Sequence, residues 1–280
     1  MAGLRMLACF AHPDDEAFPV GGTLATYAAR GVDIRLVCAT LGEEGEIRQE
    51  GSATRETLAE VRRQELRCSC RALGVQEPVV LEYRDSGMAG TRPNGHPRAF
   101  VRADGEVVRD RLVEEMRRFR PQVVLSFGPD GLYGHPDHIA ISDHTTAAFN
   151  RVLEGGGEGR PLRLFYSVRP RGFRVGMATK LREAGVDTPM PDVSRQNDGV
   201  PPEDIHVEMD TSAQVERKVR CLLCHRTQMS PDRPYHALPM DVVARIIGRE
   251  HFTRAYPPVA PGETVPADLF DGISPDACPG

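Results

Sequence analysis

The feature that most constrains the fold is an alternation of short apolar runs with longer stretches of helical periodicity over the first 170 residues. The apolar runs predict buried strands, because parallel strands that are covered on both faces are almost continuously apolar. The stretches between them place apolar side chains on one face of a helix. The strands expected from this pattern are 4–10, 32–40, 78–82, 123–127 and 162–168, and the helices are 16–30, 53–73, 106–119 and 137–151.

Strands that alternate with helices imply right-handed crossovers and a mostly parallel sheet with helices on both faces. We therefore expect a Rossmann-like α/β fold with an elaborated C-terminal half. Within that half, 169–202 has no strong period and several prolines, and 211–226 and 240–248 are expected to be helical. We predict one domain, 1–280, with an α/β core over 1–168 and an elaboration that ends in a coil tail over 169–280.

Composition excludes several classes of protein. The formal net charge of −5 argues against a nucleic-acid-binding surface built on excess positive charge, and no stretch approaches the ~20 apolar residues that cross a bilayer. The N-terminus reaches His12 before an apolar signal region forms. An odd number of cysteines, seven, favours reduced thiols over a disulfide framework. We expect a cytoplasmic protein with no nucleic-acid or membrane partner.

Cysteines also occur as two close pairs, Cys68/Cys70 and Cys221/Cys224. The second pair is followed by His225 and formally matches the string for haem attachment, but it lies in an amphipathic helical stretch. A zinc site that joins the two pairs is the other alternative, and it is weak because neither pair has a clear partner at metal-ligand spacing.

Two polar segments directly follow predicted strands. Residues 11–16 read AHPDDE after the first strand, and 133–138 read YGHPDH after the fourth. Each is expected to open a helix. Open α/β folds bind their ligands at the carboxyl ends of the strands, and in the common strand order the first and fourth strands are neighbours. The two segments are therefore expected to converge on one crevice.

The residue types in these segments suit a metal ion. His12 and Asp15, three positions apart, lie on one side of a helical turn and can chelate one divalent ion. A third ligand, from His135 or His138, gives two histidines and one carboxylate with a position left for water, which is the pattern of a catalytic zinc site. The alternative is that Asp14 and Asp15 only cap a helix.

Amide or ester hydrolysis needs further groups, and the same segments supply them. Asp14 is a candidate base, an unligated histidine a candidate acid, and Tyr133 a candidate donor to the oxyanion. Zn²⁺ would lower the pKa of its bound water toward ~7. The ligand set also suits Fe²⁺ or Co²⁺.

Together, AHPDDE and GHPDH resemble the motifs of the LmbE-like, or PIG-L, family of zinc-dependent N-deacetylases. The resemblance extends to TLGEEGE at 40–46, RDSGM at 84–88 and HRTQ at 225–228, and it is weakest over 169–205. It is strongest to the mycothiol-type branch, which contains a deacetylase acting on N-acetylglucosaminyl inositol and an amidase acting on mycothiol S-conjugates.

The resemblance implies a role for each site residue. The zinc ligands would be His12, Asp15 and His138; the general base Asp14; the general acid His135, oriented by Asp137; the oxyanion donor Tyr133; and the sugar-binding residues Arg62, Asp85 and Glu46. On the residues alone, Arg62 could equally be a solvated charge and Asp85 could make an Asx turn.

The function expected from this resemblance is a metal-dependent hydrolase that removes an N-acetyl or N-acyl group from an N-acetylglucosamine-type conjugate, a small-molecule partner. Residues 47–50 depart from the inositol-sugar enzyme, which leaves the aglycone open. The alternatives are an amidase of thiol S-conjugates, a tailoring deacetylase of a glycosylated natural product, and a non-catalytic sugar-binding protein. A homo-oligomer is compatible with all of them.

Overall fold

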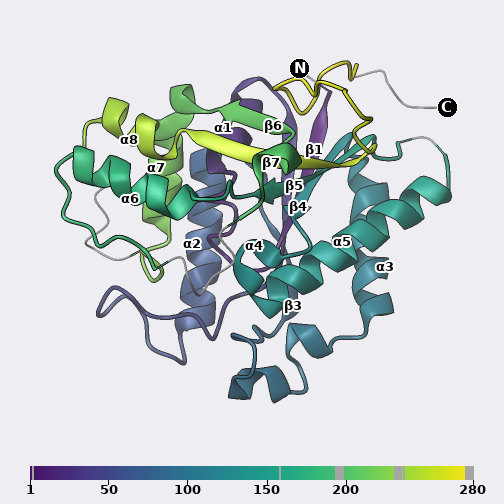
Figure 1. Cartoon of the computed structure of the whole chain (residues 1–280). Coiled ribbons are helices and arrows are strands. Elements are labelled where there is room, and N and C mark those ends of the chain that lie inside the picture. Colours follow the sequence, from purple (N-terminus) through teal and green to yellow (C-terminus); the bar gives the residue numbers. More distant parts are fainter. Residues whose placement is uncertain (2, 158, 193–198, 230–234, 236, 275–280) are drawn as a thin grey trace.

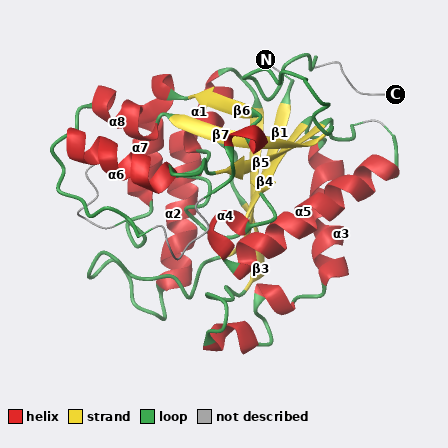
Figure 2. Cartoon of the chain, in the orientation of Figure 1, coloured by secondary structure: helices red, strands yellow, loops and turns green. Residues whose placement is uncertain are grey.

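A computed structural model describes residues 1, 3–157, 159–192, 199–229, 235 and 237–274 of the chain. It contains one seven-stranded sheet in the order β3-β2-β1-β4-β5-β7-β6, shown in Figures 1 and 2. The first five strands of this order are parallel, and the last two join it antiparallel. The strands are β1 (Arg5–Phe10), β2 (Asp33–Thr40), β3 (Val79–Tyr83), β4 (Val123–Phe127), β5 (Arg163–Val168), β6 (Val207–Asp210) and β7 (Arg249–Tyr256).

Helices cover both faces of the sheet, as Figure 2 shows. One group, α1, α2 and α7, packs together on one face, and α3 packs against α5 on the other. The α-helices are α1 (Gly21–Ala29), α2 (Leu58–Leu73), α3 (Gly105–Phe119), α4 (Gly131–Gly134), α5 (Pro136–Glu154), α6 (Phe173–Glu183), α7 (Val215–Cys224) and α8 (Met240–Ile247). The short 3₁₀ helices are η1 (Arg92–Gly95), η2 (Phe100–Arg102), η3 (Pro202–Asp204) and η4 (Ser212–Gln214).

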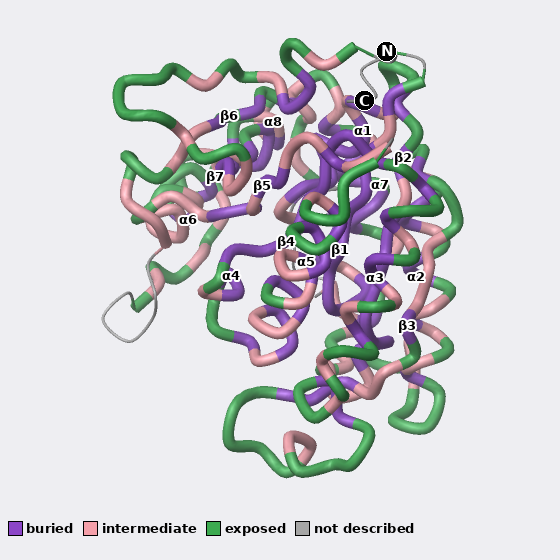
Figure 3. The backbone as a smooth tube through the Cα atoms, turned by 90° about the vertical axis from the view of Figure 1, so that its right-hand side faces the viewer, coloured by how far each residue is buried: buried purple, intermediate pink, exposed green. Residues whose placement is uncertain are grey.

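The centre of the sheet is the most deeply buried part of the chain. Every residue of β4 is buried, and so is β1 apart from its first residue (Figure 3). Met6 of β1 pairs with Ile34 on one side and with Val123 on the other. The predicted neighbourhood of the first and fourth strands is therefore confirmed, and the segments after Phe10 and Phe127 emerge at the same edge of the sheet.

Two helices begin later than the sequence pattern predicts. The segment 11–20 consists of bends and turns, with Asp14 at a φ of 106°, and α1 begins only at Gly21. The prediction of a helix from residue 16 is wrong at its start. Likewise α2 begins at Leu58 instead of residue 53.

The C-terminal half completes the sheet, which the sequence did not predict. β7 pairs antiparallel with β5 and with β6, so residues 207–256 contribute two strands. The described part of the tail after Tyr256 contains no helix or strand, as expected, and residues 275–280 lie outside the described residues. No helix in the described ranges has the length and apolar character needed to cross a membrane.

The expectation that all cysteines are free thiols is wrong. Helix α2 packs against α7, which brings the two cysteine pairs together, and Cys68 forms a disulfide with Cys224. Cys70 and Cys221 remain as buried thiols beside it, like Cys9 and Cys38 in the strands. The disulfide between Cys68 and Cys224 was therefore predicted neither by the expectation of reduced thiols nor by the alternative of a zinc site that joins the two pairs.

Candidate active site

Three potential ligand side chains converge where β1 and β4 end. His12 Nδ1 lies 3.2 Å from His138 Nε2 and 3.6 Å from Asp15 Oδ2, and His138 Nε2 lies 3.2 Å from Asp15 Oδ1. A tetrahedral ion with ligands at 2.0–2.1 Å separates its ligand atoms by about 3.3 Å. The two imidazole nitrogens and the Asp15 carboxylate, which faces His12 with Oδ2 and His138 with Oδ1, therefore have a spacing that suits a divalent metal ion, and all three side chains are buried.

The opposite nitrogens of both imidazoles are occupied. His12 Nε2 lies 3.2 Å from Asp137 Oδ2 and 3.5 Å from Asp85 Oδ1, and His138 Nδ1 lies 3.2 Å from the carbonyl oxygen of Gly131. Because these acceptors need a proton on the nitrogen that faces them, the nitrogens that face Asp15 are free to bind metal. The donor set of two imidazoles and one carboxylate fits Zn²⁺, Fe²⁺ or Co²⁺.

The charges agree with this arrangement. Burial alone would raise the pKa of Asp15, but the His138 and His12 imidazoles hold it well below its usual range. Asp15 also accepts backbone N–H groups from Ala11 and His12, at 3.2 and 2.7 Å. Asp15 is therefore ionised and fixed in place, as a metal ligand must be.

Asp14, the predicted base, points elsewhere. Its φ of 106° is rare for a residue with a Cβ and costs of the order of 1–3 kcal/mol. Its side chain is 36% exposed and reaches Arg62, whose Nη2 lies 3.4 Å from Asp14 Oδ1. Burial raises the pKa of Asp14, and the Arg62 charge opposes that shift. The carboxylate thus lies beside the metal site without contributing to the ligand triangle.

Arg62 is buried, not solvated as the alternative for it supposed. Its guanidinium donates to the carbonyl oxygens of Gly42, at 2.8 Å, and of Pro13. A Cβ at Gly42 would collide with it, and Gly42 has a φ of +66°. The position therefore requires glycine, and Arg62 connects α2 to the segment that carries Asp14.

His135 lies next to the ligand triangle. Its Nδ1 accepts the backbone N–H of Asp137 at 3.1 Å, so in the neutral ring the proton is on Nε2. Burial and the neighbouring His12 and His138 lower the pKa of His135 to about 4. Tyr133 packs edge-on against His138 and His135, is 45% exposed, and has its pKa raised by burial.

Three predicted residues make contacts other than those expected. The Asp137 carboxylate contacts His12 and the Ser86 backbone N–H, and only the backbone of Asp137 reaches His135. The Asp85 carboxylate accepts from the backbone of Gly87 and Glu44 and reaches the His12 ring, which places it behind the ligand triangle.

The third of these residues is Glu46, whose side chain is 77% exposed and pairs with Arg48 at 3.2 Å. Glu46 lies on the rim of a cavity of about 470 Å³ that opens onto the ligand triangle. Its side chain is therefore far more exposed to solvent than those of the buried Asp85 and Arg62.

Two cavities meet at Asp14, Asp15 and Tyr133. The polar one, of about 470 Å³, is lined by charged or polar residues and short loops, among them His12, Glu44, Glu46, Arg62, Asp85, Gly87, Thr91 and His135. The other, of about 410 Å³, is the more apolar of the two. It is lined by Phe18, Pro19, Leu132, Phe173, Met177, Leu222 and Met229 together with Arg48, Arg169, Arg174, His138, His225 and Gln228. The metal site thus lies between the polar cavity and this more apolar one, the apolar cavity.

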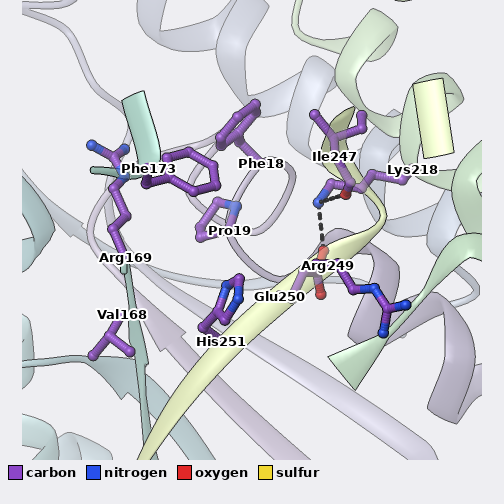
Figure 4. Close-up of a pocket in the computed structure, with 10 residues that line it drawn as sticks. All are labelled: Phe18, Pro19, Val168, Arg169, Phe173, Lys218, Ile247, Arg249, Glu250 and His251. Atoms are coloured by element: carbon purple, nitrogen blue, oxygen red, sulfur yellow. Dashed lines mark hydrogen bonds and ion pairs between the residues drawn. The ribbon is translucent and has the colours of Figure 1, made fainter. Parts of the chain in front are cut away.

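The loop that follows the first motif is anchored to the C-terminal strands. Glu250 of β7 accepts the N–H groups of Gly22 and Thr23 at the start of α1, and its other partner is the Lys218 ammonium at 2.6 Å. Figure 4 shows this ion pair beside Phe18 and Pro19. The unpredicted strand β7 therefore fixes the position of the segment that carries the metal ligands.

The sequence analysis missed Glu16. This carboxylate is buried and contacts His225, a residue more than two hundred positions away whose segment had been noted only for its resemblance to the family. The sequence indicates a special role for Glu16 only through its place directly before the apolar Ala17 and Phe18. In the predicted helix a glutamate at this position needs no explanation.

Comparisons with known proteins agree with this geometry. The profile of the family described as PIG-L, GlcNAc-PI de-N-acetylase, matches residues 7–149. The 1D-myo-inositol 2-acetamido-2-deoxy-alpha-D-glucopyranoside deacetylase of Acidothermus cellulolyticus is 37% identical over 96% of this chain and 94% of its own. The chain belongs to the PIG-L family and is an amide hydrolase that acts on a carbon–nitrogen bond other than a peptide bond. Members of this family depend on a metal ion.

Solved structures agree on the fold. The N,N'-diacetylchitobiose deacetylase from Pyrococcus horikoshii has a TM-score of 0.59 and 20% identity, over 98% of this chain and 87% of its own. The 4-carboxy-2-hydroxymuconate hydratase GalB from Pseudomonas putida is equally similar, with a TM-score of 0.58 and 18% identity over 92% of this chain and 98% of its own. A hydratase and a deacetylase share this fold, so the reaction must be argued from the site.

Proposed function

We propose that the protein is a zinc-dependent deacetylase that removes the acetyl group from an N-acetylglucosaminyl inositol or a similar amino-sugar conjugate. The observation that carries the proposal is the triangle of His12, Asp15 and His138, with two further groups, Asp14 and His135, beside it. A sugar-binding protein would need neither of these groups. The substrate is suggested by the relatives at 36–38% identity, which are named as deacetylases of this sugar.

Each residue has a proposed task in the reaction. A divalent ion held by the triangle would supply an acidified water molecule and polarise the acyl oxygen. Asp14 takes the proton from the attacking water, because its carboxylate is free of the triangle and its pKa is raised. Asp14 then passes this proton to the leaving nitrogen, so the proton taken from water leaves with the amine. His135, neutral because its pKa is lowered, acts as a hydrogen-bond donor through Nε2–H toward the leaving group, and Tyr133 donates a hydrogen bond to the developing oxyanion.

Residues behind the triangle support it. Asp137 accepts from His12 Nε2, and the Asp85 carboxylate lies 3.5 Å from the same nitrogen, so both fix the ring with Nδ1 toward the metal. Arg62 fixes Pro13 and Asp14. In the proposed complex the sugar lies in the polar cavity, where Arg62, Asp85 and Glu46 are the candidate contacts with its hydroxyl groups.

Acetate release tests the proposal. The purified protein is stripped of metal with a chelator, reloaded with Zn²⁺, Fe²⁺ or Co²⁺, and assayed on N-acetylglucosaminyl inositol and on N-acetylglucosamine. We expect release with the reloaded protein, none after chelation, and a large loss of kcat in Asp14→Ala and His135→Ala. Tight binding of the sugar conjugate by the zinc-loaded protein without turnover would instead support a sugar-binding protein.

The apolar cavity favours a second candidate, cleavage of larger amides such as thiol S-conjugates of the same sugar. An acetyl methyl group fills little of a cavity of about 410 Å³ lined by Phe18, Phe173 and Met177. Comparing kcat/KM for acetyl and for S-conjugated acyl groups on one amino sugar separates the two candidates. A preference for acetyl would reject the amidase.

A further inference from the structure

Glu16, Ser69 and His225 form a buried cluster next to the backbone of Asp14, and the proposed mechanism does not use it. Glu16 and His225 are each 1% exposed, and His225 Nε2 lies 2.5 Å from Glu16 Oε1. The hydroxyl of Ser69, also buried, donates to the same oxygen. Despite burial, His225 holds the pKa of Glu16 below its usual value, and Glu16 raises that of His225. The two side chains are therefore a buried ion pair.

The second oxygen of Glu16 reaches the catalytic segment. Glu16 Oε2 accepts the backbone N–H of Asp14 at 3.0 Å. Asp14 is one of few residues with a side chain in the left-handed region, at a φ of 106°. Such a conformation persists only where the surrounding structure imposes it. The Glu16 carboxylate supplies that constraint. Its hydrogen bond to the Asp14 N–H forms with the backbone of Asp14 in the left-handed conformation and therefore stabilises that conformation.

His225 in turn is rigidly placed. It directly follows α7, and its backbone N–H donates to Leu222 at 3.2 Å. Two residues later, Thr227 donates its N–H and its hydroxyl to Glu65 of α2, at 2.8 and 2.6 Å. Contacts with α7 and α2 on either side of His225 therefore fix the imidazole in the position from which it contacts Glu16.

We propose that Glu16 and His225 are positioning residues for the general base: together they hold the backbone of Asp14 in the left-handed conformation that turns its carboxylate away from the metal ligands and toward the substrate. This rests on the proposed function, in which Asp14 takes the proton. Neither residue is a ligand of the triangle. His225 borders the apolar cavity but is only 1% exposed, and the acetylated sugar is placed in the polar cavity, so the loss of either residue should change kcat for acetate release and leave KM and metal content near the wild-type values.

The test is a double-mutant cycle between His225 and Asp14 in the zinc-loaded full chain. We expect His225→Leu to lower kcat for acetate release about 10–100-fold, since misplacing a reacting group by 1 Å costs on that order. In the Asp14→Ala background, where the base is absent, the same change should have little further effect. His225→Gln, whose amide can still donate to Glu16, should recover most of kcat.

The control is His144→Leu, the same substitution at a histidine that lies away from the site, which should keep wild-type kcat. If His225→Leu does not fold, Ser69→Ala removes the other donor to Glu16 and replaces it in the cycle. An equal loss of kcat with and without Asp14, or no loss at all in a folded, metal-loaded variant, overturns the positioning role.

A crystal structure of His225→Leu gives a readout that does not depend on activity. We expect Asp14 to leave the left-handed region, and an unchanged φ would overturn the proposal. If Asp14 moves as expected but the wild-type protein releases no acetate from any conjugate, the proposed function fails while the structural link from His225 to Asp14 stands.

Discussion

His12 Nε2 lies 3.2 Å from Asp137 Oδ2, and this contact assigns Asp137 to the metal site instead of to His135. Asp137 is completely buried, and the same oxygen also accepts the N–H of Ser86 at 2.9 Å. A carboxylate in this place raises the basicity of the imidazole and fixes its orientation.

Asp137→Asn is therefore expected to weaken metal binding about 10–100-fold. Asparagine keeps the size and one acceptor oxygen but removes the negative charge that makes the imidazole a stronger ligand. Competition with a chromogenic chelator measures the metal affinity directly. Asp143→Asn, at an exposed position of the same helix, is the matched control and should bind metal like the wild type. Equal affinities in both variants would contradict this role.

Metal binding should also stabilise the fold. The ligand triangle joins segments that follow two different strands, so an ion binds the folded chain and not the unfolded one. At a free metal concentration 100 times the Kd, the free energy of unfolding should rise by about 2.7 kcal/mol. Urea unfolding with and without Zn²⁺ measures this gain. His138→Ala should abolish it, whereas His96→Ala, in an exposed loop, should retain it; retention in both would place the ion elsewhere.

The disulfide gives a third expectation. Cys68 and Cys224 are 156 positions apart, so their bond closes a long loop. Removing a bond of this kind in Cys68→Ala/Cys224→Ala is expected to lower the free energy of unfolding by about 2–4 kcal/mol. Cys70→Ala, next to it in α2 but without a disulfide, is the control for loss of packing alone.

Thiol titration in denaturant tests the bond itself. Reduction before the titration should expose two more thiols per chain than are found without it, because only Cys68 and Cys224 are paired among the described cysteines. An unchanged thiol count would show that the cysteines are reduced, as their odd number in the sequence had suggested.

The five parallel strands could be predicted because each reads as an apolar run, although β3 is only partly buried. β6 and β7 were not predicted because neither is an apolar run. β6 has Glu208 and Asp210 at its exposed positions, and β7 reads REHFTRAY, with Glu250 and Arg254 at buried positions. The antiparallel pairings of β7 with β5 and with β6 are long-range contacts that no local pattern encodes. The candidate active site nevertheless lies at the carboxyl ends of two predicted strands, β1 and β4.

The same reasoning explains what was found and missed in the site. The convergence of the two motifs could be predicted, because the strands that precede them are neighbours in the common strand order. The choice of His138 over His135 as the third ligand came only from the resemblance to the family and stays a prediction. The start of α1 could not be predicted, since the left-handed Asp14 is imposed by Glu16, Arg62 and distant His225. The contact of Asp137 with His12 could not be predicted either. It depends on the direction of the Asp137 side chain at the start of α5, which the spacing of residues in the sequence does not determine.

Acid should destabilise the protein partly through His144. Burial, and then the nearby Arg109 charge, lower the pKa of His144 in the folded state. The unfolded chain therefore takes up the proton first, and this contribution to stability is present above the unfolded pKa of about 6.5 and lost as the pH falls below it.

Urea unfolding between pH 7.5 and pH 5 measures this effect. His144→Gln should show a shallower fall of the free energy of unfolding than the wild type, because the variant has no proton to take up at this position. His96→Gln, in an exposed loop, should keep the wild-type slope. The assignment to His144 is wrong if both variants lose stability with pH as steeply as the wild type.

The buried ion pair between Lys218 and Glu250 is expected to contribute more to the free energy of unfolding than an exposed ion pair does. Both side chains are 1–2% exposed, and Glu250 also holds the N–H of Gly22 at the start of α1. Lys218→Met leaves that carboxylate buried without its counter-ion, which is expected to cost about 3–5 kcal/mol in the free energy of unfolding. Chemical denaturation measures the loss.

The control lies on the same helix. Arg220 and Glu216 form an exposed pair at 3.2 Å, so Arg220→Met should cost at most about 1 kcal/mol. Adding Glu250→Gln to Lys218→Met removes the unpaired charge and should recover part of the stability, because the remaining amide oxygen can still accept from Gly22. If Lys218→Met costs no more than Arg220→Met, Glu250 is not held as a buried anion, and the anchoring of α1 to β7 through it would have to be abandoned.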